Sequence, residues 1–263
     1  MPSGRGLRNP LGVAHMVVRL ESALLSQGLN VKASSDMQAF AKAKMKVRNQ
    51  PLGPMHDPDV CDFSAERAFW MAVENAEGIC VALQAFRCDF VDISLAEWCT
   101  NYMIGVYMRR NELMVPAHAK PPAGSIAERL KGKLVYHGEL WVDPQIKAAN
   151  AVDLFTKLGS YIALMKWAPD AIWALTKQRL AARGMMGRFN FSTVERGFLR
   201  WAIASDGIDP VEYLAVADRQ FLEQAVEEDL TSGPFAGLAE DPAVYDAEGP
   251  LLPHSSLTMP WLK

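Results

Sequence analysis

Two titratable side chains stand two positions apart in a segment whose pattern predicts a β-strand, residues 134–142. They are His137 and Glu139. Side chains alternate between the faces of a strand, so the spacing predicts that both share one face with Val135 and Trp141. A histidine titrates near neutral pH, and burial raises the pKa of a carboxylate, so either group could take a proton from a bound substrate. The alternatives are a polar strand face in solvent, or a His–Glu pair that only stabilises the fold.

The segment after this strand predicts an anion-binding site. Asp143 and Pro144 end the strand, and an apolar stripe at helical spacing begins at Ala151. The first turn of a helix presents backbone N–H groups without intrahelical partners and a partial positive charge, which together attract phosphate groups. Lys147, just before the helix, would add a positive charge. The alternative is an ordinary helix without a ligand, capped by Asn150.

Other chemistries find no support in the sequence. No serine stands in a G-x-S-x-G motif, and neither a P-loop nor a G-x-G-x-x-G motif is present. There is no H-E-x-x-H motif and no His and carboxylate cluster, so we expect no metal. The cysteines Cys61, Cys80, Cys88 and Cys99 have no C-x-x-C spacing. Free thiols of this kind indicate a reducing compartment, and we expect a cytoplasmic protein.

Composition and charge narrow the class of protein. Of 263 residues, 50% are hydrophobic and 22% charged, which is enough apolar material for a large core. The net charge of −3 argues against a protein built to bind nucleic acid. No apolar stretch reaches the ~20 residues that a membrane-spanning helix needs.

The two ends of the chain carry opposite charge. Residues 1–50 contain eight Lys or Arg against two Asp or Glu, whereas residues 206–263 contain two against twelve. The opposite charges suggest that the two arms lie across one body and attract each other, although two solvated faces are the commoner explanation of such charge. The basic cluster on the second helix is interpreted as a solvated face, with phosphate binding as the alternative. It comprises Lys42, Lys44, Lys46 and Arg48.

Hydrophobic periodicity predicts the elements that position these residues. The predicted helices span 13–25, 36–46, 64–75, 151–165, 177–183 and 210–228, and the predicted strands 79–87, 101–108, 134–142, 171–175, 187–191 and 197–203. The strand–helix–strand unit over 134–175 predicts a parallel pair with a right-handed crossover, while the other neighbouring strands favour antiparallel pairing. The sequence therefore predicts an α+β fold with a mixed, mostly antiparallel sheet flanked by helices.

We expect three regions along the chain. Residues 1–55 form a helical N-terminal extension, residues 56–205 form the core, and residues 206–263 form an acidic helix with an irregular tail. The tail has five prolines after residue 232, which disfavour regular structure.

The element order and one phrase of sequence resemble the GNAT superfamily of acyl-CoA-dependent N-acyltransferases over residues 64–204. In that family the corresponding strand and turn carry E-L-x-V-x-P-x-x-R-G-x-G-x-G. The matching positions are Glu139, Leu140, Val142 and Pro144. Lys147 takes the basic position, and the family's glycines are replaced by Ala148, Asn150 and Val152. A later family phrase contains a tyrosine that often protonates the leaving thiolate, and Leu180 stands there.

The resemblance implies transfer of an acyl group from acyl-CoA, or from an acyl-carrier protein, to an amine. The acceptor would be a small-molecule amine or an amino-acid-like molecule, and a long-chain N-acyl amino acid synthase is a close variant. Glu139, with His137 beside it, would supply the base. The residues implied to hold coenzyme A and the thioester are Leu140, Trp141, Val142, Lys147, Ala148, Ala149, Asn150, Ala151 and Val152.

The departures from the family phrases leave a second interpretation open. A chain that lacks the glycines and the tyrosine also fits a catalytically inactive GNAT-like module for binding or assembly. The oligomeric state, monomer or homodimer, is left open.

Overall fold

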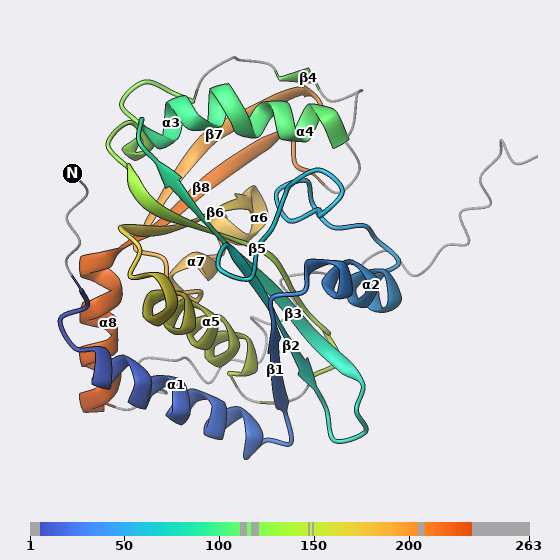
Figure 1. Ribbon diagram of the computed structural model, residues 1–263, viewed down its shortest axis with the longest axis vertical. Coiled ribbons are helices and arrows are strands. Elements are labelled where there is room, and N and C mark those ends of the chain that lie inside the picture. Colours follow the sequence, from blue (N-terminus) through green and yellow to red (C-terminus); the bar gives the residue numbers. More distant parts are fainter. Residues whose placement is uncertain are drawn as a thin grey trace, which may run out of the picture.

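A mixed β-sheet forms the centre of the molecule, with helices on both faces (Figure 1). The computed structural model describes residues 6–110, 115–116, 121–146, 148, 150–204 and 208–232. Its strands are β1 (Asn30–Ser34), β2 (Ala68–Glu74), β3 (Cys80–Val91), β4 (Val115–Pro116), β5 (Gly132–Val142), β6 (Ala171–Lys177), β7 (Thr193–Ile203) and β8 (Val211–Asp218). They follow the order β1-β2-β3-β5-β6-β8-β7-β4 across the sheet. The predicted α+β fold with a mixed, mostly antiparallel sheet is confirmed.

The helices form two layers. One face of the sheet carries α1 (Pro10–Leu25), α5 (Ala151–Trp167) and α8 (Arg219–Ser232). The other face carries α2 (Met37–Arg48) and a continuous helical segment made of α3 (Leu95–Trp98), a π-helix (Cys99–Met103) and α4 (Ile104–Arg110). Shorter elements are a 3-10 turn (Ile126–Glu128), α6 (Gln178–Ala182) and α7 (Met185–Arg188). Within the described ranges, no helix combines the length and the apolar content needed to cross a bilayer.

Strands β5 and β6 run parallel and are joined by α5, as the sequence predicts. Their pairing covers three residue pairs, from Leu134–Ala171 to Tyr136–Trp173. β5 continues to Val142 and β6 continues to Lys177. The second halves of the two strands therefore separate, while β5 remains paired with β3 through Val142. The turn into α5 leaves β5 at this separated end.

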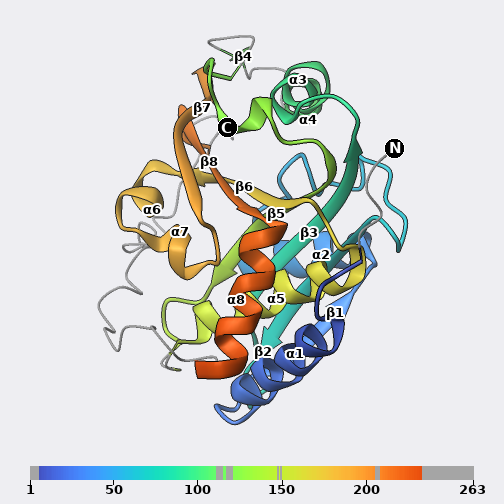
Figure 2. The same ribbon diagram turned by 90° about the vertical axis from the view of Figure 1, so that its left-hand side faces the viewer.

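The oppositely charged arms lie side by side, with α1 packed against α8 (Figure 2). Arg8 forms an ion pair with Glu223 of α8 at 2.6 Å, and the backbone N–H of Arg8 donates to the same carboxylate at 3.0 Å. Arg19 donates to the carbonyl of Leu230 at 3.4 Å. The suggested contact between the arms is present between α1 and α8. The predicted irregular tail lies outside the described residues.

Four predicted elements are wrong. The segment 64–75 is a turn and β2 instead of a helix, and 210–228 is β8 followed by part of α8. The strand predicted over 101–108 is helical, and the one over 187–191 is the end of α7 and a turn. Both β2 and β8 are buried on both faces, so they lack the alternation that marks a half-exposed strand.

The sheet draws strands from all three predicted regions. β1, which the sequence analysis missed, pairs antiparallel with β2 at one edge. β8 lies in the interior of the sheet, between β6 and β7. The first and last parts of the chain thus help to build the sheet that positions the candidate site.

Candidate active site

A β-bulge in β5 decides where the predicted catalytic residues point. The register against β3 shifts between Leu83 and Ala85, so β5 carries one extra residue after Gly138. Glu139 stands at this bulge with φ 60°, in the left-handed region that residues other than glycine rarely adopt. One extra residue reverses the alternation of faces, so His137 and Glu139 point to opposite sides of the sheet. The prediction that they share one face is wrong.

His137 lies in the core on the α5 side of the sheet. Its ring stacks on Phe86 with centroids 4.4 Å apart and lies 6.1 Å from the ring of Phe191. The residue is 3% exposed, and its Nε2 has no hydrogen-bond partner among the described residues. Burial lowers the pKa of His137 from 6.5 to about 3, so the imidazole is neutral and a weak base at physiological pH. This environment supports a packing function, and the catalytic function of His137 remains only a prediction.

We expect His137→Phe to reduce the acid sensitivity of the fold. The unfolded chain protonates this imidazole near pH 6.5 and the native state only near pH 3, so the histidine lowers stability as the pH falls below 6.5. The loss is about 2 kcal/mol near pH 5, and phenylalanine avoids it. Urea unfolding of both proteins near pH 7 and near pH 5 measures the difference, and His56 cancels because both contain it. Equal acid sensitivity would contradict a buried neutral imidazole.

Glu139 is held by groups from the first quarter of the chain. Its Oε1 accepts a hydrogen bond from the backbone N–H of Gly53 at 2.6 Å, and its Oε2 is paired with the ammonium Nζ of Lys44 in α2. The side chains of Lys44 and Glu139 are 16% and 8% exposed. Gly53 suits its position because a Cβ there would lie 2.7 Å from Oε1 of Glu139. Glu139 is therefore a shielded carboxylate that binds a primary ammonium group.

The chain after Lys44 continues along the bulge of β5. The guanidinium of Arg48 lies over the ring of Trp141, 5.3 Å from its centroid. The ring of His56 stacks on Tyr136 at 5.3 Å. A Cβ at Gly138 would lie 2.8 Å from His56, so the glycine permits this close approach. The end of α2 and the following loop thus cover β5 on the side opposite α5.

The basic cluster of α2 is divided between solvent and the sheet. Lys42 and Lys46 are exposed, as a solvated face requires. Lys44 and Arg48 point toward β5 instead, where they contact Glu139 and the indole of Trp141. The interpretation of a solvated face is therefore wrong for these two residues.

The predicted diphosphate-binding turn is described in part. Lys147 and Ala149 lie outside the described residues. Asn150 adopts a left-handed conformation with φ 56°, and α5 begins at Ala151. Ala151 and Val152 are 3% and 8% exposed and belong to the core cluster, against which Ala148 also packs. The side chains of Ala148, Ala151 and Val152 face the core, so at these three residues an anion would be bound through the backbone N–H groups.

An ion pair that the sequence analysis missed lies in the first turn of α5. Asp153 is fully buried, and its carboxylate binds Arg188 of α7 through Nε at 2.8 Å and Nη2 at 2.6 Å. The pair brings a guanidinium to the positive end of α5 together with a carboxylate that offsets its charge. The sequence signal for this pair was the presence of a charged residue, Asp153, beside the apolar stripe of the helix. No local pattern identifies its partner, Arg188, which is 35 positions away.

The other predicted ligand-binding residues follow the bulge on β5. Leu140 and Val142 pack against the hydrophobic core between the sheet and α5. Trp141 packs against the hydrophobic core between the sheet and α2. The indole Nε1 of Trp141 is buried without a hydrogen-bond partner among the described residues. The structure therefore brings Leu140 and Val142 to the side where α5 begins and places Trp141 beside Glu139.

A second carboxylate that the sequence analysis missed lies on the α3–α4 side of the sheet. Glu212 of β8 accepts a hydrogen bond from the indole Nε1 of Trp201 at 2.8 Å, and Tyr107 stacks on that indole at 5.4 Å. Burial raises the pKa of Glu212 to about 7, although the hydrogen bond from Trp201 acts in the opposite direction. In a strand over 211–218, Glu212 shares a face with Leu214, which indicates a buried carboxylate. The sequence analysis missed it because it predicted a helix over this segment.

We expect Glu212→Gln to stabilise the protein at high pH. The unfolded chain ionises this carboxyl near its ordinary pKa of 4.5 and the native state only near 7, so stability falls as the pH rises between these values. Glutamine is never ionised and keeps an acceptor for Trp201, so the variant gains about 2–3 kcal/mol near pH 8 relative to its effect near pH 5. Urea unfolding at both pH values checks this. A gain independent of pH would contradict a neutral buried carboxyl.

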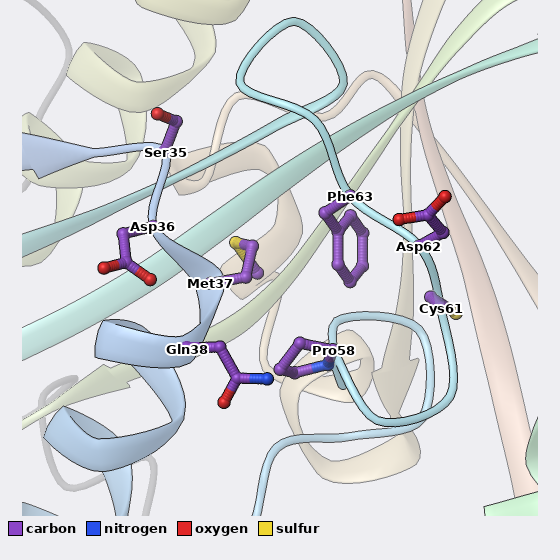
Figure 3. Close-up of a pocket in the computed structure, with 8 residues that line it drawn as sticks. All are labelled: Ser35, Asp36, Met37, Gln38, Pro58, Cys61, Asp62 and Phe63. Atoms are coloured by element: carbon purple, nitrogen blue, oxygen red, sulfur yellow. The ribbon is translucent and has the colours of Figure 1, made fainter.

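A cavity of about 300 Å³ lies at the start of α2 (Figure 3). Its lining consists of Ser35, Asp36, Met37, Gln38, Pro58, Cys61, Asp62 and Phe63. None of the residues predicted to bind coenzyme A or to act as a base lines this cavity. Asp36 uses its carboxylate to cap α2, accepting from the N–H of Ala39 at 2.9 Å. The cavity therefore lies between the start of α2 and the loop that precedes β2.

No family model and no curated protein matches the sequence. Solved structures are similar to it at low identity. NAA60 of Arabidopsis thaliana in complex with acetyl-CoA has 12% identity and a TM-score of 0.40, covering 72% of this chain and 98% of that one. The ribosomal-protein-S5-alanine acetyltransferase of Vibrio fischeri has 9% identity and a TM-score of 0.40, covering 73% and 93%.

FeeM, an N-acyl amino acid synthase from uncultured soil microbes, has 11% identity and a TM-score of 0.33, covering 83% of this chain and 91% of that one. The chain itself shows the parallel β5–α5–β6 unit within an otherwise antiparallel sheet. The solved structures to which the chain is similar thus include an acetyltransferase and an N-acyl amino acid synthase.

Proposed function

We propose that this protein transfers an acyl group from an acyl-CoA to an amine acceptor. One observation carries the proposal: Glu139, at the bulge of β5, already binds a primary ammonium group, that of Lys44. β5 and β6 separate beyond Tyr136, so the bulge lies on the part of β5 that no longer pairs with β6. A carboxylate that binds an ammonium at this point is suited to accept its proton.

The chemistry assigns a task to the residues along β5. An ammonium must lose a proton before its nitrogen can attack a thioester carbonyl, and Glu139 would accept that proton. The acceptor amine would then take the place that the ammonium of Lys44 occupies. Attack forms the C–N bond and breaks the C–S bond, and the departing thiolate takes up a proton. By resemblance to the GNAT superfamily, a backbone N–H near Leu140 or Trp141 would polarise the carbonyl.

The first turn of α5 is the proposed diphosphate site. Extended ligands with amide groups bind well along unpaired strand edges, and the β5 edge beyond Tyr136 does not pair with β6. β5 ends at Val142 and α5 begins at Ala151, and the sequence between them includes Lys147, Ala148, Ala149 and Asn150.

We expect acetyl-CoA to bind about tenfold or more tightly than acetyl-pantetheine, which has the thioester but no diphosphate. The difference should shrink as the salt concentration rises, because salt screens the exposed phosphates. Isothermal titration calorimetry with both compounds measures it. Lys147→Met should narrow the difference, and the exposed Lys46→Met is the matched control. Equal affinity for the two compounds would show that the protein does not bind the diphosphate of CoA.

A specific observation favours a second candidate, a catalytically inactive module for binding or assembly. Both carboxylate oxygens of Glu139 already have partners, Lys44 and Gly53. The glycines and the tyrosine of the GNAT phrases are also replaced. In this reading the Lys44–Glu139 pair closes a former acceptor site permanently.

The two candidates are separated by binding and turnover measured on the same preparation. Thermal unfolding with acetyl-CoA and with long-chain acyl-CoA reports binding. A thiol reagent reports release of CoA in the presence of amine acceptors, chosen as free amino acids, spermidine and a peptide with N-terminal alanine. Turnover with any acceptor supports the transferase. Stabilisation without CoA release supports the binding module, and no stabilisation by any acyl-CoA overturns the transferase.

A further inference from the structure

We propose that Lys44 is a modification site, at which the protein acylates its own Nζ. The inference rests on the proposed function, because the acyl-CoA is the donor. The ammonium of Lys44 contacts the carboxylate of Glu139, which under the proposed function takes the proton of the acceptor amine. Lys44 is therefore a tethered acceptor within the chain.

The position of Lys44 is determined by the packing of α2. The helix is capped at its start by Asp36, and Phe40 stacks on Trp70 of β2 with ring centroids 5.1 Å apart. Phe40 is fully buried, so α2 is fixed against the sheet about one helical turn before Lys44. A nucleophile held on a rigid element reacts as if it were present at very high concentration.

Burial distinguishes Lys44 from its neighbours on α2. The side chain of Lys44 is 16% exposed, whereas Lys42 and Lys46 are exposed residues of the same helix. Non-enzymatic acylation favours accessible amines, so it would modify Lys42 and Lys46 before Lys44. Acylation that prefers Lys44 requires a donor delivered to the β5 bulge from within the protein.

The reaction balances without a further reagent. Glu139 takes one proton from the ammonium of Lys44, and the free amine attacks the thioester carbonyl of acyl-CoA. The C–N bond forms, the C–S bond breaks, and the thiolate of CoA takes up a proton. The products are Nζ-acyl-Lys44 and CoA, with one proton released overall. The neutral amide can no longer form an ion pair, so Glu139 loses its charged partner and becomes available to an external amine.

The test incubates the full-length protein with acetyl-CoA and maps acetyl-lysine by peptide mass spectrometry over time. We expect Lys44 to be acetylated at least about tenfold faster than Lys42 or Lys46. Acetyl phosphate, a chemical donor without the CoA moiety, should give the reverse order. Lys44→Arg, which keeps the positive charge, should remove one acetyl group from the intact mass, whereas Lys42→Arg and Lys46→Arg should leave Lys44 labelling unchanged.

Glu139→Gln separates a catalysed reaction from simple proximity. It should slow Lys44 acetylation about 10²-fold and leave the slow labelling of Lys42 and Lys46 unchanged. CoA release with free amines but no label on Lys44 overturns this inference and keeps the proposed function. Equal labelling of the three lysines overturns it as well. No stabilisation by acyl-CoA and no label on Lys44 overturn both.

Discussion

Replacing Glu139 with glutamine should lower turnover with a free amine acceptor about 10²- to 10⁴-fold, while the affinity for acyl-CoA stays unchanged. Glutamine has nearly the same shape and can still accept the 2.6 Å hydrogen bond from the N–H of Gly53. It cannot take up a proton, so the acceptor remains an ammonium without a free electron pair. Steady-state CoA release and calorimetric titration with acetyl-CoA measure the two quantities on the same samples.

The chain offers a matched control for this substitution. Glu74 of β2 also stands in a strand and pairs with a lysine, Lys32, at 2.6 Å, but at the far side of β3 from β5. Glu74→Gln removes a comparable charge and should leave turnover unchanged. Unchanged turnover in Glu139→Gln, with the fold intact by thermal unfolding, would exclude Glu139 as the base.

Arg87→Met should cost about 3–5 kcal/mol of unfolding free energy, the largest stability effect that we expect. Arg87 in β3 is fully buried and binds the carboxylate of Asp89 at 2.7 Å. It also donates to the carbonyl of Met55 and the hydroxyl of Tyr102, each at 3.1 Å. Arg87 thus joins β3 to the loop over the β5 bulge and to the π-helix. Its removal leaves buried acceptors without their donor. Urea unfolding measures the loss.

Arg67 provides the control because it binds the same carboxylate. Its Nη2 lies 2.5 Å from Asp89, but its side chain is 36% exposed, so water screens the interaction. Arg67→Met should therefore cost less than about 1 kcal/mol. Adding Asp89→Leu to Arg87→Met should recover part of the loss, because the double variant no longer buries a carboxylate that has lost its buried guanidinium partner and keeps only the half-exposed Arg67. A similar loss of unfolding free energy in Arg87→Met and Arg67→Met would contradict the argument that burial makes the Arg87 contacts more stabilising.

The elements that the sequence predicted correctly carry their signals locally. The helix over 151–165 shows an apolar stripe that ends before Pro169, and the helix over 13–25 ends before Gly28. The strand over 134–142 ends at Asp143 and Pro144. The parallel pairing of β5 with β6 followed because strand–helix–strand units have one favoured topology. These predictions needed no knowledge of distant residues.

The elements that failed are those whose type depends on what surrounds them. The runs 68–74 and 211–218 are buried on both faces, and a continuous apolar run fits a strand or a buried helix equally well. Their neighbours in the sheet decide between the two. β1 is a short edge strand with mostly exposed residues, so its sequence has no hydrophobic pattern to recognise.

For the candidate site, the sequence by itself determined which residues could do chemistry: a glutamate and a histidine on one strand, followed by a helix start. The tertiary structure alone decided that they point to opposite sides and that Lys44, 95 positions from Glu139, occupies its carboxylate. The physical reason is the sequence separation over which each interaction acts. Caps, turns and periodicity act between residues a few positions apart, whereas a bulge and an ion pair across the fold exist only once strands and helices have packed.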